Sequence, residues 1–358
     1  MRALKFAALM LLAVACAKEG ANNTSTASST ASSSGSVDLN GAGATFPYPL
    51  YSKWFSDYAK LTGVKINYQS IGSGGGIRQL SEETVDFGAS DSPMSDQELA
   101  NAKGGPVLHI PTVLGAVVIT YNVPGLTSPI NLTPKAIADI FSGKITKWSD
   151  TRITTLNTGV TLPNADILVV HRSDGSGTTY IFTDYLTAAV PTWAGSVGKG
   201  KEVKWPVGLG AKGNEGVAGQ VKQSPAAIGY VELAYAKQNN LAIAAVQNKA
   251  GKMIVPSVPA VTAAAAGVAK SLPANTDYRI SIVNAPGADS YPISSFTWIL
   301  VYQHQRDAVK GKKLVDFLNW ALTKGEAEAP ALDYAPLPAE MAGAVKAKLA
   351  TIDLAAAK

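Results

Sequence analysis

The sequence is short of the residues that build metal centres and disulfide frameworks. Its 358 residues include one cysteine and three histidines. A single thiol cannot form an internal disulfide or a cysteine-based zinc site, and the three histidines lie far apart, without the spacing of metal ligands. We therefore expect a protein with no metal and no cofactor.

Charge of either sign is also sparse. Charged residues make up 16% of the chain, and the formal net charge is +5, spread along the sequence. Nucleic-acid-binding proteins gather basic residues on one face, so the sequence argues against nucleic acid as a partner. Apolar residues make up 46%, which suits a globular protein, and the length is enough for two domains of ordinary size.

The apolar run at residues 6–15 is too short to span a bilayer. Two basic residues precede it, and small residues end it, which is the pattern of a secretory signal. We therefore expect residues 1–15 to be a signal peptide.

Cys16 stands directly after this segment, as in bacterial lipoprotein signals, where the cysteine is acylated and becomes the new N-terminus. The match is imperfect, because Ala13 stands where those signals usually carry leucine. The alternative is ordinary cleavage after Ala15, which leaves Cys16 as a free thiol. Residues 16–36 are rich in serine and threonine and predict a flexible tether. We expect an exported protein, in the periplasm or on the outer face of the membrane, anchored by a lipid on Cys16.

Beyond residue 37, strand-like and helix-like patterns alternate, which is typical of an α/β fold with parallel strands. Strands are indicated by apolar alternation or by short, nearly continuous apolar runs, and helices by a spacing of three to four. The predicted strands are 64–70, 111–123 and 167–172, and the predicted helices are 47–61, 178–186 and 309–325.

Three strand-to-helix transitions pass through turns of small residues, at 41–47, 70–78 and 172–179. In the first turn Thr45 suits an N-cap and Pro47 suits the first helical turn. A single turn of this kind is more often structural than ligand-binding. Three of them converging would surround a tetrahedral oxyanion with backbone N–H and hydroxyl donors at the positive ends of helices.

Motifs of nucleotide binding and hydrolysis are missing. The glycines around Gly74 do not complete G-x-G-x-x-G, and there is no G-x-x-x-x-G-K-[ST] string. Neither Ser73 nor Ser176 stands in a G-x-S-x-G elbow. His171 precedes Ser176 closely, but alternation along the strand disfavours a catalytic pair, and we expect His171 to pack on the strand. These observations favour a binding protein over an enzyme.

Six sequence blocks resemble the phosphate-binding protein of bacterial phosphate ABC transporters, in that family's order and across nearly all of 38–358. Residues 250–290 carry little of the family's character. The six blocks are GAGATFPYPLYSKW (41–54), NYQSIGSGGGIRQL (67–80), VDFGASDSPMSD (85–96), HRSDGSGTTYIFTDYL (171–186), WPVGLGAKGNEGV (205–217) and AIGYVELAYAKQNNLA (227–242).

The resemblance implies an α/β periplasmic binding protein of type II, in which two lobes, each a sheet flanked by helices, meet at a hinge. We expect lobe 1 to comprise 38–117 and 290–358, and lobe 2 to comprise 118–289. The resemblance also implies high-affinity binding of inorganic phosphate, delivery to the permease subunits of an ABC importer, no catalysis and a monomeric state. The implied phosphate ligands are Thr45, Phe46 (through its N–H), Ser73 and Asp91 from lobe 1, and Arg172, Ser176, Gly177 and Thr178 from lobe 2.

Three charged residues have distinct roles within this set. Arg172 is the one cation, and a guanidinium can hold two phosphate oxygens at once. Asp174 is expected to orient Arg172, to cap the following helix, or both. Asp91 is either a turn or helix-capping residue or an acceptor for the proton that phosphate carries and sulfate lacks, a contact that would disfavour sulfate.

Three alternatives stay open from the sequence: a receptor for another oxyanion such as sulfate or molybdate, a secreted phosphatase, and a structural surface protein. Asp91 disfavours a receptor for another oxyanion, and the absence of a catalytic pair disfavours a phosphatase. A structural surface protein would leave the three turns unexplained.

Overall fold

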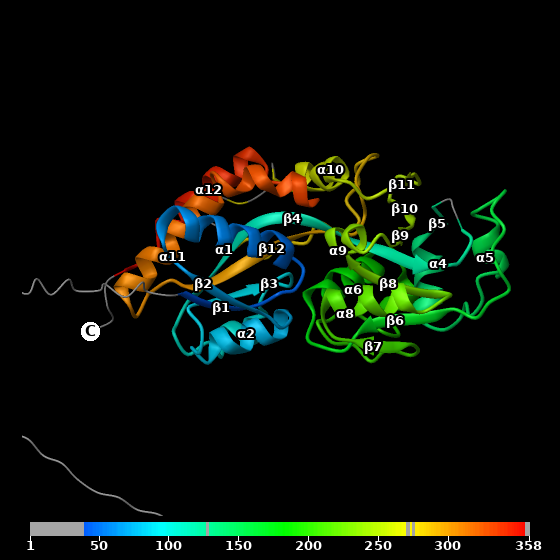
Figure 1. The fold of residues 1–358 in the computed structure, drawn as a ribbon, viewed down its shortest axis with the longest axis horizontal. Helices are drawn as coiled ribbons and strands as arrows, with labels where there is room; N and C mark the ends of the chain where they lie inside the picture. The colour runs from blue at the N-terminus through cyan, green and yellow to red at the C-terminus, as the bar shows by residue number, and fades with distance from the viewer. Residues whose placement is uncertain (1–38, 127–128, 270–272, 274–275, 355–358) are drawn as a thin grey trace, which may run out of the picture. The chain divides into compact units, whose positions relative to one another are not determined.

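The computed structural model describes residues 39–126, 129–269, 273 and 276–354, all of which belong to one unit of the chain, Ser36–Lys358 (Figure 1). The predicted signal peptide (1–15), Cys16 and the whole of the predicted tether (16–36) lie outside the described residues. Among the described helices, none combines the length and the apolarity needed to cross a membrane.

The strands fall into two sheets within the described residues, one of nine strands and one of three. The small sheet has the order β11-β10-β5. The strands are β1 (Leu39–Gly43), β2 (Ile66–Ser70), β3 (Phe87–Ser90), β4 (Val107–Asn122), β5 (Asn131–Leu132), β6 (Leu168–Arg172), β7 (Leu209–Ala211), β8 (Ala227–Glu232), β9 (Ala242–Ile243), β10 (Ala245–Gln247), β11 (Met253–Ile254) and β12 (Ser294–Tyr302).

The large sheet has the order β2-β1-β3-β12-β4-β8-β6-β7, and β9 also pairs with β4. β1 runs parallel to β2 and β3, and β6 runs parallel to β7 and β8, whereas β12 and β4 run antiparallel to their neighbours. The carboxyl ends of parallel strands meet at one edge, where ligands of open α/β sheets bind. The turns that follow β1, β2 and β3 therefore gather at one place, as do those after β6 and β7.

The long strand β4 joins the two parts of this sheet. Its residues 107–116 pair with β12, and its residues 117–122 pair with β8. All of β4 except its two end residues is buried, as expected for the nearly continuous apolar run. We call β1, β2, β3, β12 and the first part of β4 the first half-sheet, and β6, β7, β8, β9 and the rest of β4 the second half-sheet.

Helices cover the half-sheets. Figure 1 shows α2 on one face of the first half-sheet and α1, α11 and α12 on the other. In the second half-sheet, α8 and α6 pack on β8. The helices are α1 (Tyr48–Thr62), α2 (Ser73–Ser81), α3 (Asp96–Ala100), α4 (Pro134–Phe141), α5 (Thr151–Thr154), α6 (Gly177–Ala189), α7 (Pro191–Ala194), α8 (Gly213–Gln223), α9 (Leu233–Gln238), α10 (Val258–Ala269), α11 (Ala308–Ala321), α12 (Ala339–Leu349) and the 3₁₀ helix η1 (Gly325–Leu332).

The three predicted strands are confirmed. Those at 64–70 and 167–172 correspond to β2 and β6, and the one at 111–123 corresponds to β4, which begins four residues earlier. The alternation of strands and helices that the sequence predicted is therefore present in the structure.

The predicted helices at 47–61 and 178–186 are confirmed as α1 and α6. The helix predicted over 309–325 is too long at its end, because α11 stops at Ala321 and Gly325 begins η1 instead. The apolar spacing continues past the end of α11, and for this reason the pattern does not mark where the helix stops.

Aromatic side chains fill the core on both half-sheets. Ring pairs of this kind contribute roughly 0.5–1.5 kcal/mol beyond the area they bury. In the second half-sheet, the rings of Phe182 and Tyr230 stack with centroids 4.4 Å apart, and the Tyr230 hydroxyl accepts a hydrogen bond from the Arg172 N–H at 3.1 Å. The core thus holds in place the residue at the end of β6.

Candidate functional site

The turns after β1 and β2 are in direct contact. The carbonyl oxygen of Gly43 accepts hydrogen bonds from the N–H groups of Ile71 (2.9 Å) and Gly72 (2.8 Å). Gly43 has a φ of +145°, and a Cβ there would lie 2.0 Å from the carbonyl oxygen of Ala89. Only glycine fits this position, because any side chain would collide with β3. The absence of a side chain allows the end of β1 to contact both β3 and the turn that leads into α2.

Ser73, Asp91 and Gly177 also meet at one point. The Asp91 N–H donates to the Ser73 Oγ at 3.1 Å, so the start of α2 contacts the turn after β3. A Cβ on Gly177 would lie 2.4 Å from Ser73 Oγ and 2.6 Å from Asp91 Oδ2. The start of α6, which follows the second half-sheet, therefore lies directly against two side chains of the first half-sheet.

Arg172 lies at the end of β6 and is 4% exposed. Its Nε and Nη2 donate to Asp174 Oδ1 (2.8 Å) and Oδ2 (2.5 Å). Although burial opposes it, this guanidinium lowers the pKa of the Asp174 carboxyl below its usual value. Asp174 also accepts the N–H of Gly213 at 3.0 Å, at the start of α8. The predicted orienting contact is thus present, whereas the N-cap of α6 is Ser176 and not Asp174.

The remaining nitrogen of Arg172 is free for another partner. A guanidinium that binds a carboxylate through Nε and Nη2 directs Nη1 away from that carboxylate. Nη1 is buried and has no hydrogen-bond partner among the described residues. A buried, charged donor of this kind costs free energy unless an acceptor meets it, which points to a ligand oxygen.

Thr45 and Thr178 are joined through a residue that the sequence analysis had not singled out. The side-chain amide of Asn214 donates to Thr45 Oγ1 at 2.7 Å and to Thr178 Oγ1 at 3.0 Å. The predicted N-cap role of Thr45 is wrong, because the N-cap of α1 is Pro47 and the Thr45 hydroxyl binds Asn214 instead.

Phe46 and Ser176 complete the predicted set. Phe46 is buried, and its carbonyl oxygen accepts the Tyr334 hydroxyl at 2.6 Å. The Ser176 Oγ accepts the Thr179 N–H at 3.0 Å, and its own N–H donates to the carbonyl oxygen of Lys201 at 2.9 Å. The predicted ligand residues therefore lie at a strand end, in turns or at helix starts, where the two half-sheets meet.

The carboxyl of Asp91 is almost completely buried, with 1% of the residue exposed. Thr297 donates to its Oδ1 at 2.8 Å. Burial raises the pKa of Asp91 to about 7, although the hydrogen bond from Thr297 and the charge of Arg172 oppose the rise. Asp91 is not the cap of the nearby helix α3, which begins with a capping box between Ser95 and Glu98.

His171 packs on the second half-sheet, as expected. Its ring stacks on Trp205 with centroids 4.9 Å apart and an interplanar angle of 16°, and its Nδ1 lies 3.0 Å from the carbonyl oxygen of Arg172. Partial burial lowers the pKa of this imidazole. Among the described residues, no group of three or more His, Cys, Asp or Glu side chains is arranged to hold a metal ion.

Two residues that contact the site were missed by the sequence analysis, Asn214 and Thr297. A signal for the first was present, since Gly213 and Asn214 open a helix one residue after β7, as in the three turns that were recognised. Thr297 lies within the apolar strand β12 and contacts Asp91 across 206 residues of sequence, so no local pattern marks it.

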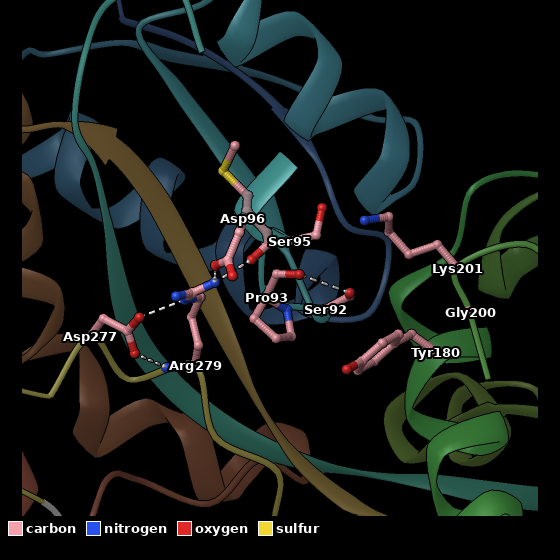
Figure 2. Close-up of a pocket in the computed structure, with 10 residues that line it drawn as sticks. Ser92, Pro93, Ser95, Asp96, Tyr180, Gly200, Lys201, Asp277 and Arg279 are labelled. Atoms are coloured by element: carbon pink, nitrogen blue, oxygen red, sulfur yellow. Dashed lines mark hydrogen bonds and ion pairs between the residues drawn. The ribbon is translucent and has the colours of Figure 1, made fainter. Parts of the chain in front are cut away.

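A cavity of about 480 Å³ opens beside these residues (Figure 2). Residues 92–96, which follow β3, line one side of the cavity, and Tyr180 of α6 and Lys201 line the other side. Arg279 reaches into it from the atypical stretch 250–290 and pairs with Asp96 at 2.6 Å. Lys201 pairs with Glu98 at 2.6 Å, so ion pairs connect opposite walls beside the site.

Comparison with known proteins places the chain. A family model described as a PBP superfamily domain matches residues 24–324. The phosphate-binding protein PstS of Pasteurella multocida (strain Pm70) is 46% identical over 314 residues, which cover 87% of this chain and 90% of that protein. PstS of Xylella fastidiosa (strain 9a5c) is 44% identical over 327 residues, which cover 91% of this chain and 88% of that protein.

Solved structures agree on the fold. A high-affinity periplasmic phosphate-binding protein, PfluDING, solved with bound phosphate at pH 8.5, superposes with a TM-score of 0.69 at 23% identity, covering 87% of this chain and 93% of that one. A phosphate-binding protein from Stenotrophomonas maltophilia superposes with a TM-score of 0.67, also at 23% identity and with the same coverage of both chains. The predicted two-lobed α/β fold of type II is confirmed.

The resemblance inferred from the six sequence blocks is likewise confirmed, since relatives of this identity cover most of the chain. The chain therefore belongs to the PBP superfamily and, within it, to the family of the phosphate-binding proteins PstS.

Proposed function

We propose that the protein binds inorganic phosphate with high affinity between its two lobes and delivers it to the permease of a phosphate ABC importer. The names of its relatives support phosphate as the ligand. The proposed phosphate ligands are those that the sequence predicted: Thr45, Phe46, Ser73, Asp91, Arg172, Ser176, Gly177 and Thr178.

One observation carries this proposal: a buried cation and a buried carboxyl lie together among neutral donors. Arg172 has a free Nη1 and interacts electrostatically with Asp91, which lies against the starts of α2 and α6 at Ser73 and Gly177. Neutral donors and one guanidinium suit a small oxyanion, because each replaces a hydrogen bond that the ion made to water.

Asp91 supports phosphate over sulfate. Near neutral pH phosphate carries a proton that can be donated to a carboxylate oxygen, whereas sulfate has none to donate. A buried carboxylate beside sulfate would face it with an unrelieved repulsion. Thr297 donates to Oδ1 at 2.8 Å, whereas Oδ2 receives only the longer hydrogen bond from the Ser73 hydroxyl, at 3.4 Å. We therefore assign Oδ2 to the phosphate proton, with the Ser73 hydroxyl then free to turn toward the anion.

We propose that the protein binds phosphate without hydrolysing phosphate esters. The Ser176 Oγ accepts the N–H that caps α6, whereas the His171 ring stacks on Trp205 and its Nδ1 contacts the Arg172 carbonyl. These contacts do not pair Ser176 with His171 as a nucleophile with its base. A chromogenic phosphate ester should remain intact during incubation with the protein, and sustained release of the phenol would favour a phosphatase.

The lobe boundaries are proposed as 38–117 with 290–358, and 118–289. The change of partner along β4, from β12 to β8, supports this division. We also propose a monomer that is exported and anchored by acylation of Cys16; the intact mass of the mature protein would reveal the lipid.

Replacement of Arg172 by alanine should abolish measurable phosphate binding in calorimetric titration. Charge-assisted hydrogen bonds are worth roughly 1.5–3 kcal/mol each, so loss of the cation should weaken binding by about 100-fold or more. Arg172→Lys keeps the charge without the fork and should bind with intermediate affinity. Arg306→Ala, a change at an arginine whose side chain is 68% exposed, is the matched control and should bind like the parent. Undiminished binding by folded Arg172→Ala would rule out this site.

Replacement of Asp91 by asparagine should weaken discrimination against sulfate. The amide can donate to an oxyanion and carries no charge, so sulfate affinity should rise and phosphate affinity should fall. Competition titrations with both ions at pH 8 measure the ratio. If the unaltered protein already binds sulfate as well as phosphate, Asp91 does not select the ligand.

Asp91 should also make the ligand-free protein less stable as pH rises. Burial raises its pKa from 3.8 to about 7, so the folded protein keeps a proton that the unfolded chain releases above pH 4. This stabilisation is complete below about pH 4 and is lost as pH rises through 7. Relative to the parent, Asp91→Asn should therefore gain stability between pH 4 and 7, by at most about 1.4 kcal/mol per pH unit. Urea unfolding without phosphate measures it, and a pH-independent difference would contradict the raised pKa.

A further inference from the structure

Asn214 holds a central place in the site although no ligand role is assigned to it. It is the second residue of α8 and is completely buried. Its side chain contacts hydroxyls that follow β1 and β6, one from each half-sheet. Its backbone N–H also donates to Thr45 Oγ1, at 3.2 Å. One residue therefore supplies three hydrogen bonds to two of the proposed ligands.

The orientation of the Asn214 amide is fixed by its surroundings. The backbone N–H of Glu232 donates to Asn214 Oδ1 at 2.9 Å. A backbone N–H can only donate, so the oxygen of the amide must face it and the NH₂ group must face the two threonines. The start of α8 is held in turn by Gly213, whose N–H donates to Asp174. The amide is therefore a donor to both hydroxyls, with no freedom to reverse.

A threonine hydroxyl has one proton and two acceptor lone pairs, and either can face a neighbour. At Thr45 both lone pairs are engaged, by the backbone N–H and the side-chain NH₂ of Asn214. At Thr178 one lone pair is engaged by the same NH₂. The proton of Thr45 is thus left for a third partner, and that of Thr178 is turned from the amide. An oxyanion needs donors, and a hydroxyl that presents a lone pair would repel it.

We propose that Asn214 is a positioning residue that sets both threonine hydroxyls as donors to the bound oxyanion. This inference rests on the proposed function, and it assigns to Asn214 no contact with the anion itself. The residue acts by occupying both acceptor sites of Thr45 and one acceptor site of Thr178, so that the hydroxyl protons are left to face the anion. The same contacts connect the two half-sheets at the ligand.

A purely structural role would place Asn214 as a support for α8 alone. The two roles differ in their dependence on Thr45. If Asn214 acts through the threonine hydroxyl, removing that hydroxyl must remove much of the effect of the Asn214 substitution on affinity. If it only supports α8, the two substitutions act independently and their effects on affinity add.

The experiment is a double-mutant cycle measured by calorimetric titration of the mature protein with phosphate. Asn214→Ala should weaken binding roughly 10- to 100-fold, as expected for hydrogen bonds that govern donors to a charged ligand. In a Thr45→Val background the same substitution should cost at least threefold less. Equal costs in both backgrounds, or no cost of Asn214→Ala alone, would overturn the proposal. Asn319→Ala, at an exposed amide on α11, is the matched control and should bind like the parent.

A second variant, Asn214→Asp, tests the positioning role of Asn214 even if Thr45→Val binds phosphate too weakly to titrate. Asn214→Asp has nearly the same shape, but its carboxylate only accepts and would draw both threonine protons away from the anion. Binding at pH 8.5 should be weaker than in Asn214→Ala, and it should recover relative to the parent as pH falls and the new carboxyl is protonated. Parent-like affinity of Asn214→Asp at pH 8.5 would overturn the proposal.

The parent protein is titrated with both phosphate and sulfate in the same series. Failure of the parent to bind phosphate would refute the proposed function. The role of Asn214 is judged separately, from the ratio of variant to parent affinity for whichever of the two ions the parent binds.

Discussion

The site depends on the ion pair between Arg172 and Asp174. Two of the three guanidinium nitrogens are held by one carboxylate, at 2.8 and 2.5 Å, and the third is buried without a partner among the described residues. A buried cation with a fixed direction is costly on its own, and its cost falls when an anion arrives. Because Asp174 also accepts the N–H of Gly213, the ion pair fixes the start of α8 as well. The cation and the start of α8, which carries Asn214, are therefore positioned together.

Around this ion pair, the fold supplies donors mainly through backbone geometry. Parallel strands end at a common edge, and each continues into a helix whose first N–H groups point back toward that edge. Close approach of these ends requires residues without side chains, as at Gly43 and Gly177. Buried Asp91 is the exception to this array of donors, and its contact with Thr297 keeps it an acceptor on one oxygen. This combination is the basis of the proposal that the site favours an anion which still carries a proton.

Much of this arrangement was predictable because it is local in sequence. The turns at 41–47, 70–78 and 172–179 combine small residues with strand and helix patterns, and the structure brings them to one place. The parts that sequence reasoning missed depend on tertiary contacts. Asn214 meets Thr45 across 169 residues, and although it opens a helix after a strand, no local pattern shows which distant hydroxyl its amide contacts. For the same reason Thr45 was assigned as a cap: a local rule fits it, but a distant amide binds its hydroxyl.

The most direct test of the account is a crystal structure of the mature protein grown with phosphate. The account predicts one phosphate at the junction of the two half-sheets, with an oxygen within hydrogen-bonding distance of Arg172 Nη1 and another facing the Asp91 carboxyl. A phosphate bound elsewhere, with Arg172 and Asp91 out of reach of its oxygens, would contradict the central claim.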